Sequence, residues 1–215
     1  MTSAWTFSGN CVIDGAGSSI IFNPTGKLII ERGSTVRFKN IAIKGLNDGQ
    51  LFCVNNAGKV IFNNTVWAQD SNVTFSHGSF EVIDVLTMEG KGSTFSYKST
   101  RQSVIDPRAT LNLLSDFTLS YEPLSTARNL IYLSDRTSKI VMESASLSST
   151  STGLQLTNGY LEVHGDCYLY SNAAYQPEGI IFGDGMTEDS DLKIDIFQES
   201  NLQILSGYLT YKNVA

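Results

Sequence analysis

The chain has 215 residues, of which 41% are hydrophobic and only 17% charged, and its formal net charge is −6. Abundant aromatic and β-branched residues exclude a disordered chain and favour short strands joined by tight turns. The acidic balance excludes nucleic acid as a partner, because phosphates attract a basic surface. No apolar run reaches the length of a transmembrane helix.

The dominant pattern is an internal repeat, in which an apolar-alternating run, a short polar break and a second run recur. Its copies lie at 26–31 with 35–40, 58–64 with 65–67, 109–114 with 117–119, 138–143 with 145–147, 159–164 with 167–169 and 200–205 with 208–210. A third short strand precedes several copies, at 50–54, 129–133, 153–156 and 179–183. Three strands in each unit predict a three-sided coil, whose stacked copies bury a shared interior.

We therefore predict an all-β fold, a parallel β-solenoid of about eight or nine coils that occupies residues 1–215 as a single domain. A β-sandwich is the competing fold, since it also has short strands at regular intervals. The two-residue turns that join sandwich strands are scarce, and Asn158-Gly159 lies inside a repeat. The pattern also predicts that residues 98–108 form a long insertion between strands.

Two N-terminal segments resemble those of the right-handed parallel β-helix (pectin-lyase-like) superfamily. They are CVIDGAGSSIIF at 11–22 and VRFKNIAIKG at 36–45. The coils are also similar to those of bacterial surface proteins, adhesins and phage tail spikes. The resemblance implies right-handed coiling and leaves enzyme and scaffold both open.

The acidic run near the C-terminal end is a candidate calcium site. Asp184, Glu188, Asp189 and Asp191 offer oxygen ligands beside flexible glycines. The run lacks the spacing of a known calcium loop, so a solvated acidic turn is the alternative. Apart from calcium, no cofactor is expected.

Two further groups of residues are candidates for a surface that binds a glycan or a protein partner. Lys98, Arg101 and Arg108, with Asp106 among them, could bind an acidic sugar, or could form a solvated ion-pair group. In the run CYLY, the alternation of a strand places Tyr168 and Tyr170 on the face opposite Cys167 and Leu169. Other tyrosines and both tryptophans could extend this aromatic surface, or could point into the core.

The sequence contains no catalytic constellation. His77 and His164 have no carboxylate at a motif spacing, and no phosphate-binding loop, GxSxG or HExxH motif occurs. Cys11, Cys53 and Cys167 have no metal-ligand spacing and are expected to be buried thiols. Three or more acids with a basic residue on one outer face would instead favour an enzyme.

The repeat continues to the last residues without a polar cap, which solenoids need for solubility. We expect either a segment of a longer exported protein, located outside the cell or at its surface, or coil ends that associate between copies. A cytoplasmic location applies if the chain is complete. The predicted function is a non-catalytic structural or adhesive component of a surface fibre, spike or coat. The alternative is a polysaccharide lyase or hydrolase.

Overall fold

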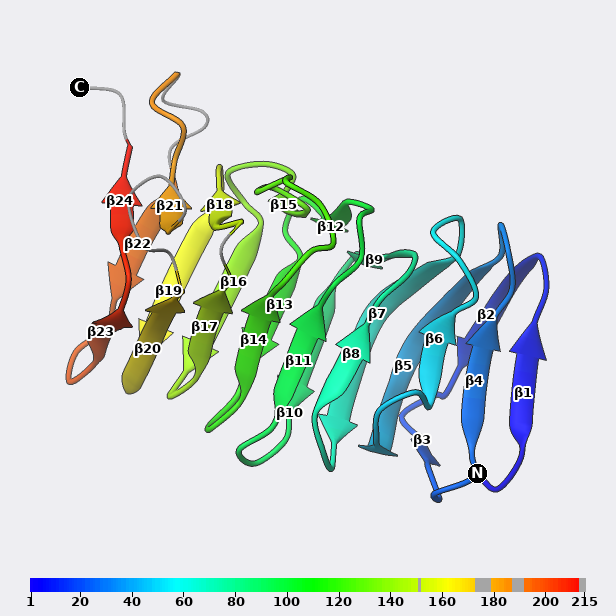
Figure 1. Cartoon of the computed structure of the whole chain (residues 1–215). Coiled ribbons are helices and arrows are strands. Elements are labelled where there is room, and N and C mark those ends of the chain that lie inside the picture. The colour runs from blue at the N-terminus through cyan, green and yellow to red at the C-terminus, as the bar shows by residue number, and fades with distance from the viewer. Residues whose placement is uncertain (151, 173–178, 187–191, 213–215) are drawn as a thin grey trace.

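The computed structural model describes residues 1–150, 152–172, 179–186 and 192–212. In these ranges every regular element is a β-strand, and neighbouring strands pair in parallel. Figure 1 shows the strands stacked as successive coils along one axis, with the chain termini at opposite ends. The predicted all-β parallel solenoid is thereby confirmed. Nowhere in the described ranges is there a helix long and apolar enough to cross a membrane.

Three stacks of strands form the three faces of the coil. Face 1 contains β1 (Ala4–Phe7), β4 (Lys27–Ile30), β6 (Leu51–Cys53), β8 (Val73–Phe75), β11 (Thr94–Tyr97), β14 (Thr118–Tyr121), β17 (Ser146–Ser149), β20 (Asp166–Ser171) and β23 (Asn201–Ser206). These strands belong to a three-stranded and a six-stranded sheet, and the boundary between the sheets lies between β6 and β8.

Faces 2 and 3 share two long strands that turn the corner between them, β5 (Thr35–Leu46) and β7 (Lys59–Gln69). Face 2 contains β2 (Asn10–Asp14), the first halves of β5 and β7, β9 (Ser79–Val82), β12 (Ser103–Ile105), β15 (Ile131–Leu133), β18 (Leu154–Leu156), β21 (Ile180–Phe182) and β24 (Leu209–Tyr211). Face 3 contains β3 (Ser19–Ile21), the second halves of β5 and β7, β10 (Val85–Glu89), β13 (Thr110–Leu113), β16 (Lys139–Glu143), β19 (Tyr160–His164) and β22 (Lys193–Ile196).

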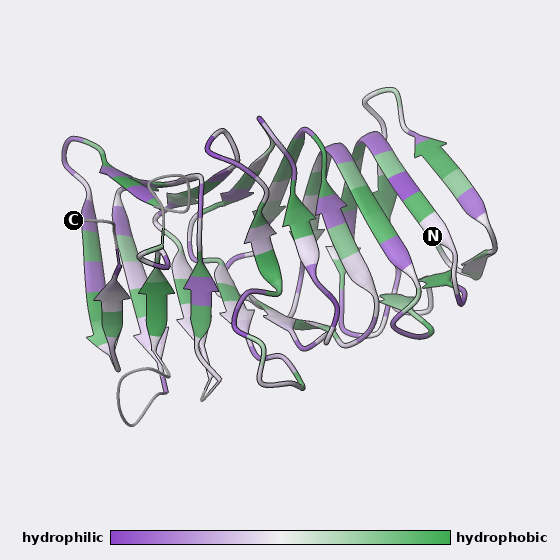
Figure 2. Cartoon of the chain, turned by 90° about the horizontal axis from the view of Figure 1, so that it is seen from above, coloured by the Kyte–Doolittle hydropathy of each residue, from purple (hydrophilic) through white to green (hydrophobic). Residues whose placement is uncertain are grey.

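The core consists of inward rows that run from coil to coil, because the pairing aligns like positions. Phe95 is in register with Leu119, and Leu119 with Leu147. Figure 2 shows hydrophobic and hydrophilic bands alternating along many strands, as this arrangement requires. Aromatic rings fill the middle of the core. Trp67 meets Phe95 edge-on, with ring centroids 5.6 Å apart, and Tyr97 stacks on Tyr121 at 6.2 Å.

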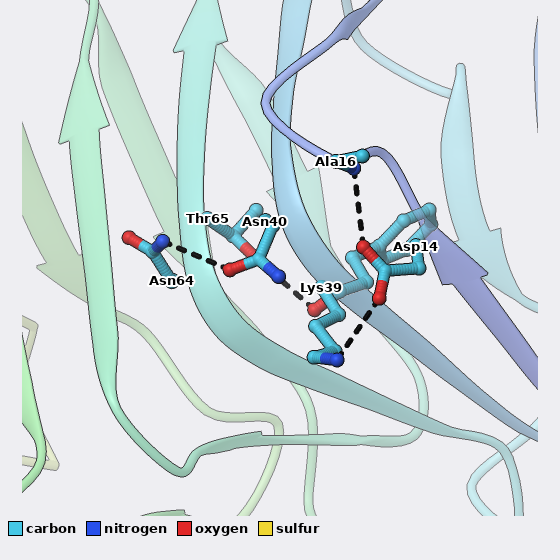
Figure 3. Close-up of polar contacts among 7 residues, drawn as sticks. Asp14, Ala16, Lys39, Asn40, Asn64 and Thr65 are labelled. Atoms are coloured by element: carbon cyan, nitrogen blue, oxygen red, sulfur yellow. Dashed lines mark hydrogen bonds and ion pairs between the residues drawn. The ribbon is translucent and has the colours of Figure 1, made fainter.

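Two corners between faces 2 and 3 are formed by asparagines in the left-handed backbone region. Asn40 has φ 48° and Asn64 has φ 52°, a region that asparagine tolerates better than most residues. Figure 3 shows how the two corners stack, with the Asn64 side-chain amide donating to Asn40 Oδ1 at 3.0 Å. On face 2, Lys39 of β5 pairs with Asp14 of the preceding coil at 2.9 Å. The hydrogen bond from Lys39 is the main reason why the pKa of Asp14 lies below its usual value.

The inward rows are incompletely covered in the first and last coils of the described chain. Trp5 is in register with the fully buried Leu28, yet 47% of Trp5 is exposed. Ile204 is in register with the buried Leu169, yet 50% of it is exposed. These side chains have a neighbouring coil on one side only, so each end of the stack presents an apolar surface.

The predicted insertion at 98–108 is wrong. This segment contains β12, which pairs with both β9 and β15 on face 2. Its buried Ser103 and Ile105 give it only two inward side chains, too few to produce an alternating apolar pattern. A longer irregular connection lies between β14 and β15, at residues 122–130.

Candidate functional site

The acids predicted to bind calcium fall mostly outside the described residues, because only Asp184 of the four is described. Asp184 follows β21, is half-buried, and accepts a hydrogen bond from the Met186 N–H at 2.8 Å. Glu188, Asp189 and Asp191 lie outside the described ranges. Within those ranges, no group of three or more histidine, cysteine or acidic residues could hold a metal ion. The calcium site stays a prediction.

The three predicted basic residues do not form one cluster. Lys98 follows β11 on face 1 and pairs with Glu122 at 3.4 Å. Arg101 is exposed at the next corner, before β12, whereas Arg108 lies beyond β12 with φ 65°. A strand of face 2 therefore separates Arg108 from the other two.

Tyr168 and Tyr170 face outward on β20, as the alternation predicts. Cys167 and Leu169, which alternate with the two tyrosines along the strand, are buried, whereas 36% of Tyr170 is exposed. The pairing aligns Tyr168 with Ser146, and Tyr170 with Ser148. Both rings thus continue rows that begin on earlier strands of face 1.

These rows form an in-register ladder of hydroxyl groups. Thr94, Thr118 and Ser146 occupy one row, and Ser96, Ser120 and Ser148 the parallel row. We call these six residues with Tyr168 and Tyr170 the hydroxyl–tyrosine track. Neighbouring rungs repeat at the sheet spacing of about 4.8 Å.

Glu122 borders the track and fixes two of its hydroxyls. Ser96 donates to Glu122 Oε1 at 3.2 Å, and Ser120 donates to the same atom at 2.5 Å. Lys98 pairs with the other carboxylate oxygen. The charges of Glu122 and Lys98 therefore offset each other. Ser120 is itself buried, so the track offers its other hydroxyl groups and its aromatic rings. Such a surface suits uncharged, hydroxylated ligands better than ions.

A second group of chemically active side chains lies outward on face 3, where β16, β19 and β22 align. Lys139, Tyr160 and Lys193 share one row, and both ammonium groups lie 5.7 Å from the centre of the Tyr160 ring. Lys139 also forms an ion pair with Glu162. We call this region the face 3 patch; it also contains Glu143, His164, Asp195 and Phe197.

A smaller pair of acidic residues, Glu81 and Asp106, lies on face 2. Lys59 forms an ion pair with Glu81, and Asp106 lies near both. Burial raises the pKa of Asp106, and the negative charge of Glu81 adds to this effect. The sequence pattern missed this pair because Asp106 was assigned to an insertion rather than to the end of a strand.

The remaining candidates of the aromatic surface divide between core and exterior. Trp67, Tyr97 and Tyr121 are buried, whereas Trp5, Tyr208 and Tyr211 are exposed. Tyr175, also a candidate, lies outside the described ranges. Two of the three cysteines, Cys53 and Cys167, are buried free thiols as expected, and Cys11 is half-buried. His164 is half-buried on the outside of face 3, with its ring 4.1 Å from that of Phe197.

Comparison with the models of known protein families gives no match. Comparisons with curated proteins and with solved structures give none either.

Proposed function

We propose that this protein is a non-catalytic adhesive β-solenoid whose hydroxyl–tyrosine track binds a glycan. The observation that supports this most directly is the register, which places Tyr168 and Tyr170 on the same rows as the threonine and serine hydroxyls. Tyrosine rings stack on the apolar faces of sugars, and hydroxyl groups exchange hydrogen bonds with sugar hydroxyls. The N-terminal motifs and the parallel coils together support membership of the pectin-lyase-like superfamily.

A binding measurement with matched variants tests this proposal. We expect a neutral β-glucan to bind the chain, and the double change Tyr168→Ala and Tyr170→Ala to weaken binding about tenfold, since each aromatic contact contributes about 0.5–1.5 kcal/mol. Tyr132→Ala, at an outward position on face 2, is the control and should bind as the unchanged chain does. Equal binding by all three proteins would contradict the proposal.

We further propose that the coils associate end to end, as components of an extracellular fibre, spike or coat. The exposed inward rows of the first and last coils support this, because a second copy would cover Trp5, Ile204 and Tyr211. Light scattering after size exclusion should show a mass that rises with concentration. Trp5→Lys should reduce the rise, whereas Val12→Lys, an outward and 66% exposed position in the same coil, should not. A constant monomer mass at every concentration argues against end-to-end stacking.

The face 3 patch favours a second candidate function, a polysaccharide lyase or hydrolase. Glu143, Glu162 and Asp195 share this face with Lys139 and Lys193, the combination expected of an enzyme of this fold. This face meets the condition stated above for an enzyme. We nevertheless rank adhesion first, because the ion pair with Lys139 engages Glu162, the acid on the central strand β19. Depolymerisation of acidic polysaccharides with added Ca²⁺ decides between them. Turnover that Glu162→Gln abolishes would replace the adhesive function with the catalytic one.

A further inference from the structure

The stack is interrupted at one place on face 1. β6 and β8 are consecutive on this face, yet β6 ends one sheet and β8 ends the next. On the other two faces the same coils are joined, because β7 pairs directly with β9 and with β10. The two coils therefore separate on face 1 alone (Figure 1).

A cleft of about 350 Å³ opens at this separation. We call it the sheet-break cleft; its lining comprises Asp48, Gly49, Phe52, Cys53, Thr74, Phe75, Ser76 and His77. The lining begins in the turn before β6 and ends in the turn after β8. The cleft thus follows the direction of the strands, as a bound extended segment would.

Main-chain groups of both strands point into the cleft. Val54 N donates to Ile30 O, so the main-chain groups of Val54 point toward β4. Lys98 N donates to Phe75 O, so those of Phe75 point toward β11. Successive residues of a strand point their N–H and C=O groups to opposite neighbours. Leu51 and Cys53 on one side, and Thr74 and Ser76 on the other, therefore face the cleft. No strand among the described residues pairs with either edge.

Asp48 holds one of these groups. The Thr74 N–H donates to Asp48 Oδ1 at 2.8 Å, so the carboxylate takes the position that the carbonyl of a neighbouring strand would otherwise have. Asp48 is exposed and brings a negative charge to the cleft. A basic side chain on an incoming segment would be attracted to this charge.

The floor of the cleft restricts the size of the inward side chains. Cys53 is 2% exposed and Phe75 is 3% exposed, so the core beneath the cleft is already closed. Burial also raises the pKa of the Cys53 thiol to about 12, so the thiol adds no charge to the floor of the cleft. We therefore expect a bound segment to carry a small side chain such as alanine toward the core.

We propose that the sheet-break cleft binds an extended peptide segment of a partner protein, aligned with β6 and β8. The segment has small side chains toward the core and basic side chains outward, near Asp48. Main-chain hydrogen bonds to the groups of the two edges that Asp48 does not bind supply affinity, and the alternating side chains supply specificity. This site adjoins the hydroxyl–tyrosine track, because Thr74 is in register with Ser96, but it does not depend on the proposed glycan binding.

The test uses the full chain and a fluorescein-labelled peptide, Ala-Lys-Ala-Lys-Ala, with both ends blocked. Fluorescence anisotropy should show saturable binding. N-methylation of the central alanine should weaken it about tenfold, because the loss of an N–H leaves a main-chain acceptor without its donor. Ser76→Trp fills the cleft and should weaken binding at least as much. Asn112→Trp, an outward position on β13 of face 3, is the control and should leave binding unchanged.

A charge reversal at Asp48 gives a result that a loss of folding cannot produce. Asp48→Lys should weaken binding of Ala-Lys-Ala-Lys-Ala and strengthen binding of Ala-Glu-Ala-Glu-Ala. The proposal is overturned if no saturation occurs up to about 1 mM, which corresponds to about −4.1 kcal/mol. Equal affinity for the N-methylated peptide would also overturn it, as would equal losses in the two tryptophan variants.

Discussion

Single hydroxyl groups of buried tyrosines hold the irregular connection at residues 122–130 to the core. Tyr121 Oη donates to Ala127 O at 2.7 Å and accepts a hydrogen bond from Leu130 N at 3.1 Å. Tyr97 Oη lies one coil earlier, 2.9 Å from Ser103 Oγ. Because residues 122–130 form no strand, these contacts replace part of the pairing that holds the other segments in place.

Replacing Tyr121 by phenylalanine should therefore destabilise the chain. The change keeps the ring but leaves the buried Leu130 N–H without its acceptor, which costs about 1–3 kcal/mol. Urea unfolding measures the loss. Tyr132→Phe alters an outward tyrosine on face 2 and should change the free energy of unfolding by less than about 0.5 kcal/mol. Indistinguishable midpoints for the two variants would show that the hydroxyl contributes nothing.

The ionisation of Asp106 should lower the free energy of unfolding as the pH rises. Its pKa is raised in the folded state, mainly by burial, so the folded chain holds the proton more tightly than the unfolded chain does. The contribution is present below the usual pKa of 3.8 and is lost as the pH rises through the folded value. Melting curves of the chain and of Asp106→Asn, recorded from pH 3.5 upward, should show the Asn variant gaining relative stability with pH. A difference that is constant or of opposite slope would contradict this.

The outward side chains could be predicted only where the sequence settles which face of a strand is buried. Cys167 and Leu169 identify the inner face of β20, so Tyr168 and Tyr170 were correctly placed outside. Tyr97 shares its face with Phe95, and two aromatic residues on one face are compatible with either side. Only the stacking of Tyr97 between Phe75 and Tyr121 shows that this face is the core.

At the scale of elements, the asparagine corners determine where β5 and β7 change face. Asn64 has φ 52°, and its side chain bonds to Asn40 of the previous coil. Asn64→Ala should cost about 1–2 kcal/mol from the left-handed backbone alone, whereas Asn64→Gly should cost less. Asn63→Ala, on the same strand with negative φ, is the control. Denaturant unfolding checks the order of the three variants, and an equal loss in Asn63→Ala would refute the corner mechanism.

The repeat pattern predicted many strands, both long and short, and missed others such as β12. The short strands predicted at 50–54, 129–133, 153–156 and 179–183 contain β6, β15, β18 and β21. β4, β13, β16 and β19 lie within the recognised copies, because each alternates over four or five residues. β12 was missed because its hydroxyl and single aliphatic group, Ser103 and Ile105, give no apolar signal of their own. Pairing with β9 and β15 is what makes this segment a strand.

At the scale of the whole molecule, the solenoid was predictable but its candidate sites were not. A repeat of apolar alternation requires stacked coils, because no single unit can bury its own inward row. The hydroxyl–tyrosine track depends on which residue of one coil stands beside which residue of the next. That register depends on the length of every corner, and corners such as 122–130 vary in length without changing the alternation within strands.

The free energy of local opening should vary along the stack, and amide hydrogen exchange should vary with it. The inward rows of β7, β10 and β13 are buried and have coils on both sides, whereas Trp5 of β1 and Ile204 of β23 are half exposed. In a stack stabilised by nearest neighbours, the end coils open at lower free energy. Amides of β1 and β23 should therefore exchange fastest, and those of β7, β10 and β13 slowest. Uniform exchange along the chain would contradict this distribution.

The same measurement distinguishes intrinsic opening of the end coils from their proposed association. A second copy that covers the end coils binds only the closed state, so it must slow their exchange as the protein concentration rises. Exchange in β10 and β13 should not change with concentration, because these strands already have neighbours on both sides. Trp5→Lys should remove the concentration dependence in β1, while Val12→Lys should retain it. If end-coil exchange is equally fast at every concentration, the ends open independently and no second copy covers them.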